Sequence, residues 1–224
     1  MTLAVFVGCT QSPESPEPSL SAESRVQPSA TPTAKDDRPL IVAFGDSLSE
    51  GLGVQPGSSF PDQLQAKLDT GGYAYRISNL GVSGDTTTGG LSRLQYAVSL
   101  KPSIVILELG GNDGLRGIPV ASTKANLGKM ISAFQKAGAS VLLAGMTLPP
   151  NYGSDYIQEF ENAYRDLAKE HDVRLIPFLM EDILAQYRSR PGLMQRDGVH
   201  PTAQGHAIIA ETVFRYLQPM LKRS

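Results

Sequence analysis

The sequence predicts an α/β fold, a three-layer αβα sandwich built on a five-stranded parallel sheet. From residue 40 onward, short apolar runs alternate with longer segments of helical period. Two of these runs, 103–109 and 140–145, are almost continuously apolar, which is typical of parallel strands covered on both faces. Strands and helices in alternation favour a parallel sheet with helices on both sides. We expect the flavodoxin-like order, in which the first strand lies between the second and the third.

The expected elements follow one another regularly along the chain. The strands cover residues 40–44, 75–79, 103–109, 140–145 and 174–177. After each strand, apolar residues recur every three to four positions, which predicts an amphipathic helix there. No internal repeat is visible, so we expect one folded domain over residues 39–222. The residues on the apolar helix faces are, in chain order, Phe60, Leu64 and Leu68; Leu91, Leu94 and Val98; Leu127, Ile131 and Phe134; Ile157, Phe160, Tyr164 and Leu167; and Ala207, Ile208, Val213 and Leu217.

The composition argues against several classes of protein. The chain has 224 residues, a formal net charge of −2 and no long basic run, so we expect no nucleic-acid partner. Its one cysteine, Cys9, excludes an intramolecular disulfide and a thiolate metal site. Three histidines without an H-E-x-x-H motif, and the lack of a P-loop or of G-x-G-x-x-G after a strand, favour a mechanism with no metal and no other cofactor. We expect a monomer.

The first 38 residues differ in character from the rest. Residues 1–9, MTLAVFVGC, resemble the end of a bacterial lipoprotein signal, in which Cys9 is the candidate for lipidation. The segment has no positively charged start and only a short apolar stretch, so a hydrophobic leader without that role stays open. Residues 10–38 are rich in Ser and Pro and have no hydrophobic period, which predicts a disordered linker. Together these segments predict a lipid-anchored bacterial protein, attached to a membrane in the periplasm or at the outer surface.

Polar loops follow the first four expected strands. In chain order they read GDSLSEG, LGVSGDTT, GGNDGLRG and MTLPPNYGSDY. Ligands of open α/β sheets bind at the carboxyl ends of the strands, where these loops meet. The first three loops are rich in Gly, which lets a backbone N–H approach a ligand closely. The sequence therefore predicts a built site at this edge of the sheet.

The first loop contains Ser47, which either caps the next helix or acts as a nucleophile. A hydrolytic serine needs a base, and the base needs an acid that orients it. His200 stands in a turn, three residues after Asp197 and directly before a proline, whereas His171 and His206 fall in helical segments. Proline restricts the preceding residue to extended conformations, and the spacing lets Asp197 fold back onto Nδ1 of His200, which leaves Nε2 free for Ser47. An ordinary polar turn before a helix is the alternative interpretation.

Three hydrogen-bond donors can surround an oxyanion beside Ser47. In the expected strand order, the loops after the first three strands are neighbours, because adjacent strands lie about 4.8 Å apart. The Ser47 N–H, the Gly81 N–H and the side-chain amide of Asn112 can then converge on one point. For Asn112, a role as an ordinary turn residue is the alternative.

Four blocks of the chain resemble those of one enzyme family. FGDSLS, NLGVSGDTT, ELGGNDGLRG and DGVHP are similar, in order and spacing, to the blocks of the SGNH (GDSL) hydrolases. GGNDGLRG and LPPNYGSDY are most similar to the bacterial multifunctional acyl-CoA thioesterase, lysophospholipase and arylesterase group. The resemblance implies that Ser47 is the nucleophile, His200 the base and Asp197 the orienting acid. It also implies an oxyanion hole formed by Ser47, Gly81 and Asn112.

The same resemblance implies the reaction and the range of substrates. We expect a serine esterase that hydrolyses small acyl and aryl esters through an acyl-serine intermediate, and thioesters and lysophospholipids belong to the implied range. The loop after the fourth strand carries Leu148, Pro149 and Tyr152, which we expect to bind the acyl chain; a proline-stiffened connection is the alternative. Two other functions stay open. One is a carbohydrate acetyl esterase of the same superfamily, and the other is a catalytically inactive, anchored α/β binding module.

Overall fold

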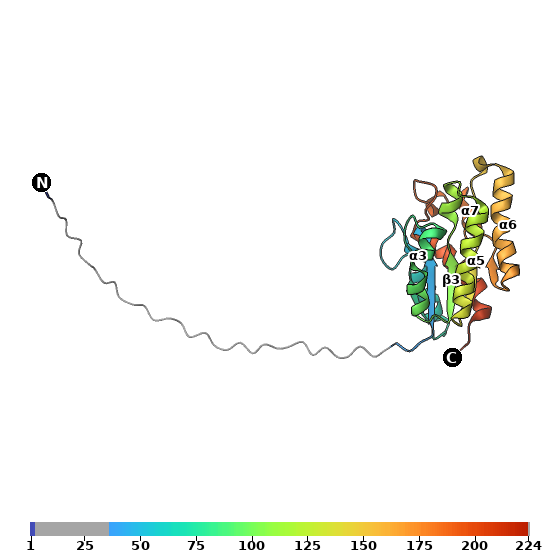
Figure 1. Cartoon of the computed structure of the whole chain (residues 1–224), viewed down its shortest axis with the longest axis horizontal. Coiled ribbons are helices and arrows are strands. Elements are labelled where there is room, and N and C mark those ends of the chain that lie inside the picture. Colours follow the sequence, from blue (N-terminus) through green and yellow to red (C-terminus); the bar gives the residue numbers. More distant parts are fainter. Residues whose placement is uncertain (3–35, 224) are drawn as a thin grey trace. The chain divides into compact units, whose positions relative to one another are not determined.

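Five parallel strands form the centre of the fold in the computed structural model, which describes residues 1–2 and 36–223 (Figure 1). They pair side by side in the order β2-β1-β3-β4-β5. The expected fold class and the expected place of the first strand are therefore confirmed. Cys9 and most of the predicted linker lie outside the described residues. The strands are β1 (Leu40–Gly45), β2 (Arg76–Asn79), β3 (Ile104–Glu108), β4 (Ser140–Ala144) and β5 (Arg174–Ile176).

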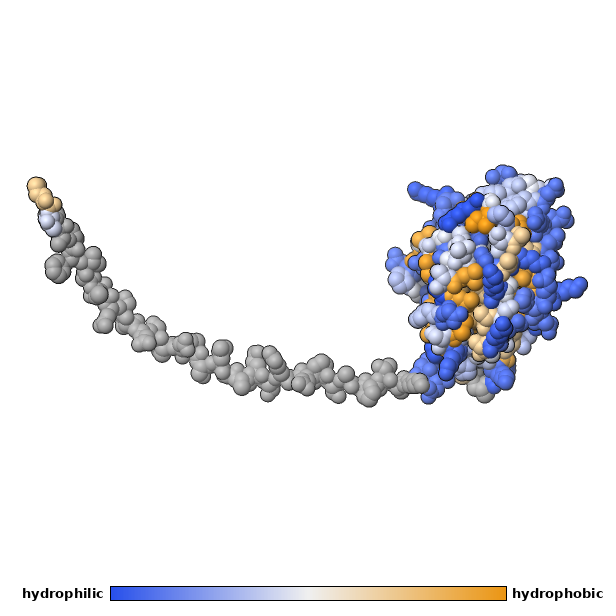
Figure 2. Space-filling model, in the orientation of Figure 1, coloured by the Kyte–Doolittle hydropathy of each residue, from blue (hydrophilic) through white to orange (hydrophobic). Residues whose placement is uncertain are grey.

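Two layers of long helices cover the sheet. On one side α2 (Phe60–Thr70) packs against α8 (Ala203–Leu217). On the other side α5 (Val120–Lys136) lies between α3 (Thr87–Ser99) and α6 (Ser154–Glu170), as Figure 1 shows. Each of these helices lies where the apolar period of the sequence predicts one. Among the described residues, no helix is long and apolar enough to cross a membrane. The face of the folded part seen in Figure 2 is largely hydrophilic, with smaller apolar patches between the polar residues.

Several short helices at the carboxyl edge of the sheet and in the C-terminal segment were not expected from the sequence. They are too short to show an apolar period of their own, since each has one or two turns. The α-helices among them are α1 (Ser47–Glu50), α4 (Gly111–Leu115) and α7 (Glu181–Tyr187), and the 3-10 turns are η1 (Pro150–Tyr152), η2 (Pro191–Leu193) and η3 (Gln218–Met220).

The two central strands are buried along their whole length. Every residue of β1 and of β3 is buried, because helices cover both faces of the sheet. On one face the ring of Phe44 packs edge-on against Phe134 of α5, with the ring centroids 5.6 Å apart. The register pairs Gly45, the last residue of β1, with Glu108, the last residue of β3. The loops that follow these strands therefore leave the sheet side by side.

Candidate active site

The turn after β1 places Ser47 at the start of α1. Asp46 is the N-cap of this helix, since its Oδ1 accepts the Leu48 N–H at 3.1 Å. The cap is thus Asp46 and not Ser47, which removes the helix-cap alternative for the serine. The Ser47 N–H has no hydrogen-bond acceptor among the described residues, and the residue is only 8% exposed. This N–H is therefore available to a ligand at the edge of a pocket.

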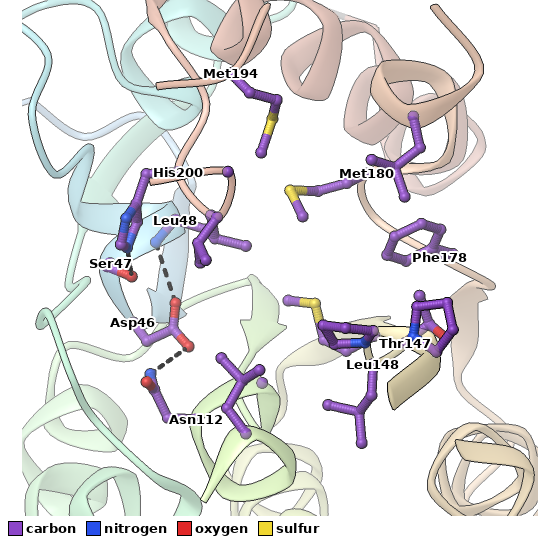
Figure 3. Close-up of a pocket in the computed structure, with 18 residues that line it drawn as sticks. Asp46, Ser47, Leu48, Asn112, Thr147, Leu148, Phe178, Met180, Met194 and His200 are labelled. Atoms are coloured by element: carbon purple, nitrogen blue, oxygen red, sulfur yellow. Dashed lines mark hydrogen bonds between the residues drawn. The ribbon is translucent and has the colours of Figure 1, made fainter. Parts of the chain in front are cut away.

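Ser47, His200 and Asp197 form one chain of hydrogen bonds. His200 Nε2 lies 2.9 Å from Ser47 Oγ, a contact drawn in Figure 3, and His200 Nδ1 lies 2.7 Å from Asp197 Oδ2. The serine comes from the first loop of the sheet and the other two residues from the segment before α8, 150 positions further along the chain (197 − 47). The structure thus brings together the three residues that the sequence analysis selected as nucleophile, base and orienting acid.

The turn around Asp197 keeps its carboxylate charged. Asp197 Oδ1 accepts the backbone N–H groups of His200 at 3.0 Å and of Val199 at 2.9 Å. These bonds lower the pKa of Asp197 to about 2; the His200 N–H contributes most, followed by the His200 ring and the Val199 N–H. A charged Asp197 fixes the proton of a neutral His200 on Nδ1 and leaves Nε2 as the acceptor that faces Ser47.

Asn112 lies on α4, beside the turn that carries Ser47. Its Nδ2 donates to Asp46 Oδ2 at 3.0 Å and to the Asp85 carbonyl at 2.9 Å. The first of these bonds is visible in Figure 3. Asn112 therefore connects the loops after β1, β2 and β3 and is more than a turn residue. Its amide lies next to Asp46 in the wall of the pocket. Because both Nδ2 hydrogens are donated in these two bonds, Asn112 can serve as an oxyanion donor only by exchanging one of them for the oxyanion.

Gly81 does not take the position that the sequence analysis gave it. Its N–H donates within its own loop, to Asn79 Oδ1 at 2.9 Å, and so is not presented to the pocket. A Cβ at Gly81 would lie 2.1 Å from the Glu50 nitrogen. This glycine allows the loop after β2 to pack closely on the end of α1. Gly81 is thus corrected from an oxyanion donor to a packing residue.

Gly84 of the same loop is the better candidate for an oxyanion donor. It has a φ of +80°, and its N–H has no hydrogen-bond acceptor among the described residues. Its carbonyl accepts from Arg116 at 3.0 Å, and the next residue, Asp85, accepts from Asn112. The signal that the sequence analysis missed is the Ser-Gly-Asp turn, where a left-handed glycine leaves its N–H without a partner.

An apolar cavity of about 470 Å³ opens beside Ser47 and His200 (Figure 3). Leu148 and Pro149 line it, as expected from the sequence, whereas Tyr152 does not. The Tyr152 hydroxyl donates to the Leu115 carbonyl at 2.8 Å, and its ring stacks on Tyr156. Tyr152 is therefore corrected from a substrate-binding residue to one that holds η1 against α4.

Most of the opposite wall of the cavity was missed in the sequence analysis. It comes from segments that the motifs do not include, the connection after β5, α7 and the stretch before His200 (Figure 3). The only sequence signal was the group of apolar residues in PFLMEDIL, which also suits a buried core segment. The lining residues of this wall are Phe178, Met180, Leu184 and Met194.

A family comparison agrees with this geometry. The model of the GDSL-like lipase/acylhydrolase family matches residues 43–208, which include the whole hydrogen-bonded chain from Ser47 to His200. The chain belongs to this family.

Three named relatives of this GDSL-family chain match over most of their length. It is 40% identical over 182 residues to esterase TesA of Pseudomonas aeruginosa, a match that covers 81% of this chain and 89% of that protein. It is 39% identical over 178 residues to an arylesterase of Vibrio mimicus, with coverage of 79% and 87%. It is 37% identical over 182 residues to thioesterase 1/protease 1/lysophospholipase L1 of Escherichia coli K12, with coverage of 81% and 84%. A crystal structure of TesA superposes with a TM-score of 0.76 at 40% identity, over 82% of this chain and 100% of that one.

The remaining histidines of this GDSL-family chain take no part in the site. His171 is the C-cap of α6. His206, in α8, is fully buried, and neither ring nitrogen has a hydrogen-bond partner among the described residues. Burial lowers the pKa of His206 to about 4, so the ring is neutral near pH 7. Within residues 1–2 and 36–223, no three His, Cys, Asp or Glu side chains are grouped so that they could hold a metal ion.

Proposed function

We propose that this protein is a serine esterase that hydrolyses carboxylic esters through an acyl-serine intermediate. The observation that carries the proposal is the 2.9 Å contact between Ser47 Oγ and His200 Nε2 at the mouth of an apolar cavity. Membership of the GDSL-like lipase/acylhydrolase family supports it, and so do the names of the relatives, which are an esterase, an arylesterase and a thioesterase/lysophospholipase.

The proposed cycle has two half-reactions, acylation of Ser47 and hydrolysis of the acyl-serine, and both use the same polar groups. His200 accepts the Ser47 proton as Oγ attacks the ester carbonyl, and Asp197 stabilises the imidazolium that results. The oxyanion is bound by the Ser47 N–H and by the Asn112 amide, which exchanges its bond to the Asp85 carbonyl for the oxyanion. The Gly84 N–H is the candidate for a third donor. His200 then protonates the leaving alcohol. Water, which gives a proton to the same histidine, then attacks the acyl-serine. The carboxylic acid leaves, and His200 returns the proton to Ser47 Oγ.

The cavity favours an ester with an apolar acyl or aryl group. Its lining is mostly aliphatic, aromatic and methionine side chains, and Leu115, Leu184 and Val199 are exposed where they line it. A carbohydrate acetyl esterase would need polar groups to bind sugar hydroxyls, and this wall offers few. We extend the proposal to acyl thioesters and lysophospholipids, since their acyl chains suit the same apolar wall.

A chain-length series of p-nitrophenyl esters tests the function. We expect hydrolysis of the butanoyl to octanoyl esters, loss of activity in Ser47→Ala, and wild-type activity in Ser122→Ala, a control on the exposed side of α5. A preference for acetylated sugars over the octanoyl ester would favour the acetyl esterase. A wild-type protein without activity on any ester would favour the inactive binding module.

We also propose that the chain is attached to a membrane through a lipid on Cys9. The apolar start of the sequence up to Cys9 and the following Ser/Pro-rich stretch support this localisation. We expect Cys9→Ser to move the protein from the membrane fraction to the soluble fraction. Unchanged partitioning would remove the proposal.

A further inference from the structure

A fully buried acid, Glu108, lies directly beneath the turn that carries the nucleophile. It is the last residue of β3 and is 0% exposed. Its side chain passes over Gly45, where a Cβ would lie 2.3 Å from Glu108 Oε2 and 2.1 Å from Ser49 Oγ. The glycine of the GDSL motif thus leaves the space that this acid occupies.

Glu108 holds the turn on both sides of Ser47. Its Oε2 accepts the Asp46 N–H at 3.1 Å and the Ser49 hydroxyl at 2.7 Å. The second oxygen, Oε1, is buried and has no hydrogen-bond partner within the described part of the chain. The neighbouring titratable group is the carboxyl of Asp46. One side chain therefore fixes the residue before the nucleophile and the second residue after it.

Asp46 extends this contact to the oxyanion side of the pocket. Asp46 is only 3% exposed. Its carboxyl accepts hydrogen bonds from the Leu48 N–H and from the side-chain amide of Asn112. A charged carboxylate is the better acceptor for these two N–H groups. The hydrogen bonds that hold the start of α1 and the side chain of Asn112 thus both depend on the protonation state of Asp46.

Two buried carboxyl groups in contact cannot both be charged at low cost. Burial raises the pKa of Glu108 well above its usual range, and the charge of Asp46 raises it further. Burial also raises the pKa of Asp46, to about 6, while hydrogen bonds from Leu48, Glu108 and Asn112 and the charge of His200 lower it. Near pH 7 the favoured state is a charged Asp46 and a protonated Glu108.

The other charged or titratable groups around the pair are few within the described residues. Arg93 of α3 donates to the Gly45 carbonyl at 2.8 Å and is neutralised by Asp85, whose Oδ2 its Nε contacts at 2.6 Å. Tyr164 of α6 is buried, and its hydroxyl donates to the Leu109 carbonyl at 3.0 Å. Neither group supplies a hydrogen bond to the Glu108 carboxyl, so the pair has to share its own proton.

We propose that Glu108 is a positioning residue that acts as a neutral carboxylic acid. By donating its proton to Asp46, it keeps the nucleophile turn and Asn112 in the geometry that ester hydrolysis needs. The activity part of this inference rests on the proposed function. The protonation part does not.

Glu108→Gln separates a neutral acid from a carboxylate. The glutamine amide is a permanent donor to Asp46, and its oxygen can still accept from Asp46 and Ser49. We expect its kcat to stay within about threefold of wild type at pH 7. Glu108→Ala should lower kcat by about 10- to 100-fold with little change in KM, because Glu108 does not touch the substrate. A Glu108→Gln variant as impaired as a folded Glu108→Ala variant would overturn the inference.

The pH profile of kcat and an infrared spectrum both respond to the protonation of Glu108. Neither would change if Glu108 only filled space in the fold. Wild-type kcat should fall at alkaline pH as Glu108 loses its proton, whereas Glu108→Gln should stay level there. Ser49→Ala is the matched control: it removes one bond to the same carboxyl and should keep the wild-type alkaline fall.

The infrared spectrum at pH 8 tests protonation without any activity. We expect a carbonyl band of a protonated carboxyl group in the wild type and in Ser49→Ala, but not in Glu108→Gln. A wild-type spectrum without this band would overturn the inference, even if ester hydrolysis is confirmed. If the band is present but no ester is hydrolysed, the proposed function fails while the protonation of Glu108 stands.

Discussion

Asn112 connects the turn that carries Ser47 to the loop after β2, and we propose it as an oxyanion donor. Removal of one oxyanion donor typically raises the barrier by about 2.7–4 kcal/mol, so Asn112→Ala should lower kcat by about 10²- to 10³-fold. KM should change little, because the donor acts mainly in the transition state. Steady-state kinetics on the octanoyl ester measure this, with the exposed Asn162→Ala as control. A loss confined to KM would contradict the role.

Asp197 orients His200 and must remain charged to do so. Asp197→Asn keeps the shape of the side chain but can present its amide to Nδ1, which selects the wrong tautomer of the ring. We expect kcat to fall by about 10³- to 10⁴-fold, with Asp155→Asn on the first turn of α6 as the control. Residual activity within tenfold of wild type would argue against a working Asp197–His200 pair.

Single residues were predictable where a motif fixes both the residue type and its role. Ser47, His200 and Asp197 meet because the strand order and the turn before Pro201 bring their segments together. Gly81 was assigned wrongly because the direction of a loop N–H depends on a local acceptor, here Asn79, that a motif does not encode. Tyr152 was assigned wrongly because a tyrosine can turn its hydroxyl to a backbone carbonyl and pack away from the pocket.

At the scale of elements, the segment from β5 through α7 forms much of one wall of the cavity, and we propose that this wall binds the acyl chain. Met180 precedes α7 and lines the cavity. Met180→Ala removes apolar contact area, at about 0.8 kcal/mol per buried methylene, so kcat/KM for the octanoyl ester should fall about tenfold. The acetyl ester, which is too short to reach this wall, should be hydrolysed as by wild type. Kinetics on the two esters check this.

The exposed Tyr96→Ala variant on α3 is the control for this change in the wall. It should leave the ratio of octanoyl to acetyl activity unchanged. An equal loss on both esters in Met180→Ala would show that the residue supports the fold or the catalytic residues and not the acyl chain.

The long helices could be predicted from the sequence, whereas the short helices could not. Helices such as α6 show an apolar face over several turns, with Phe160, Tyr164 and Leu167 buried. In α7 only Ile183 is buried, and one buried position gives no period. Tertiary packing at the pocket decides its conformation, so the sequence pattern alone could not locate this wall.

The stability of the whole molecule depends on pH through His206. Its pKa is lowered from 6.5 to about 4 in the fold, so the unfolded chain binds its proton first as the pH falls. The stabilisation is present above pH 6.5 and is lost as the pH falls toward 4. His206 alone should lower the free energy of unfolding by about 2 kcal/mol between pH 7 and pH 5. The raised pKa values of Asp46 and Glu108 act in the opposite direction, since the folded state then binds protons at higher pH than the unfolded chain.

Urea unfolding of His206→Leu at pH 7 and pH 5 isolates the contribution of this histidine. From pH 7 to pH 5, the free energy of unfolding should fall less in the variant than in wild type, and the difference should be about 2 kcal/mol. His171→Leu, a replacement at the C-cap of α6, should keep the wild-type dependence. A His206→Leu variant with an unchanged pH dependence would show that the buried ring is not the group responsible.

The architecture of the whole molecule was predictable because the alternation of elements and the handedness of their connections leave few topologies. The cavity was less predictable, since it forms where five separate segments meet: the turns after β1 and β3, the loop after β4, the stretch around α7 and the turn before α8. Its shape depends on how these segments pack, and no segment carries that information alone.

Mass spectrometry of the protein after reaction with a fluorophosphonate tests the central claim most directly. We expect one equivalent of phosphonyl group on the peptide that contains Ser47, with labelling slowed strongly in His200→Ala and absent in Ser47→Ala. Labelling of another residue, or labelling of Ser47 at the same rate without His200, would contradict the account of an activated serine.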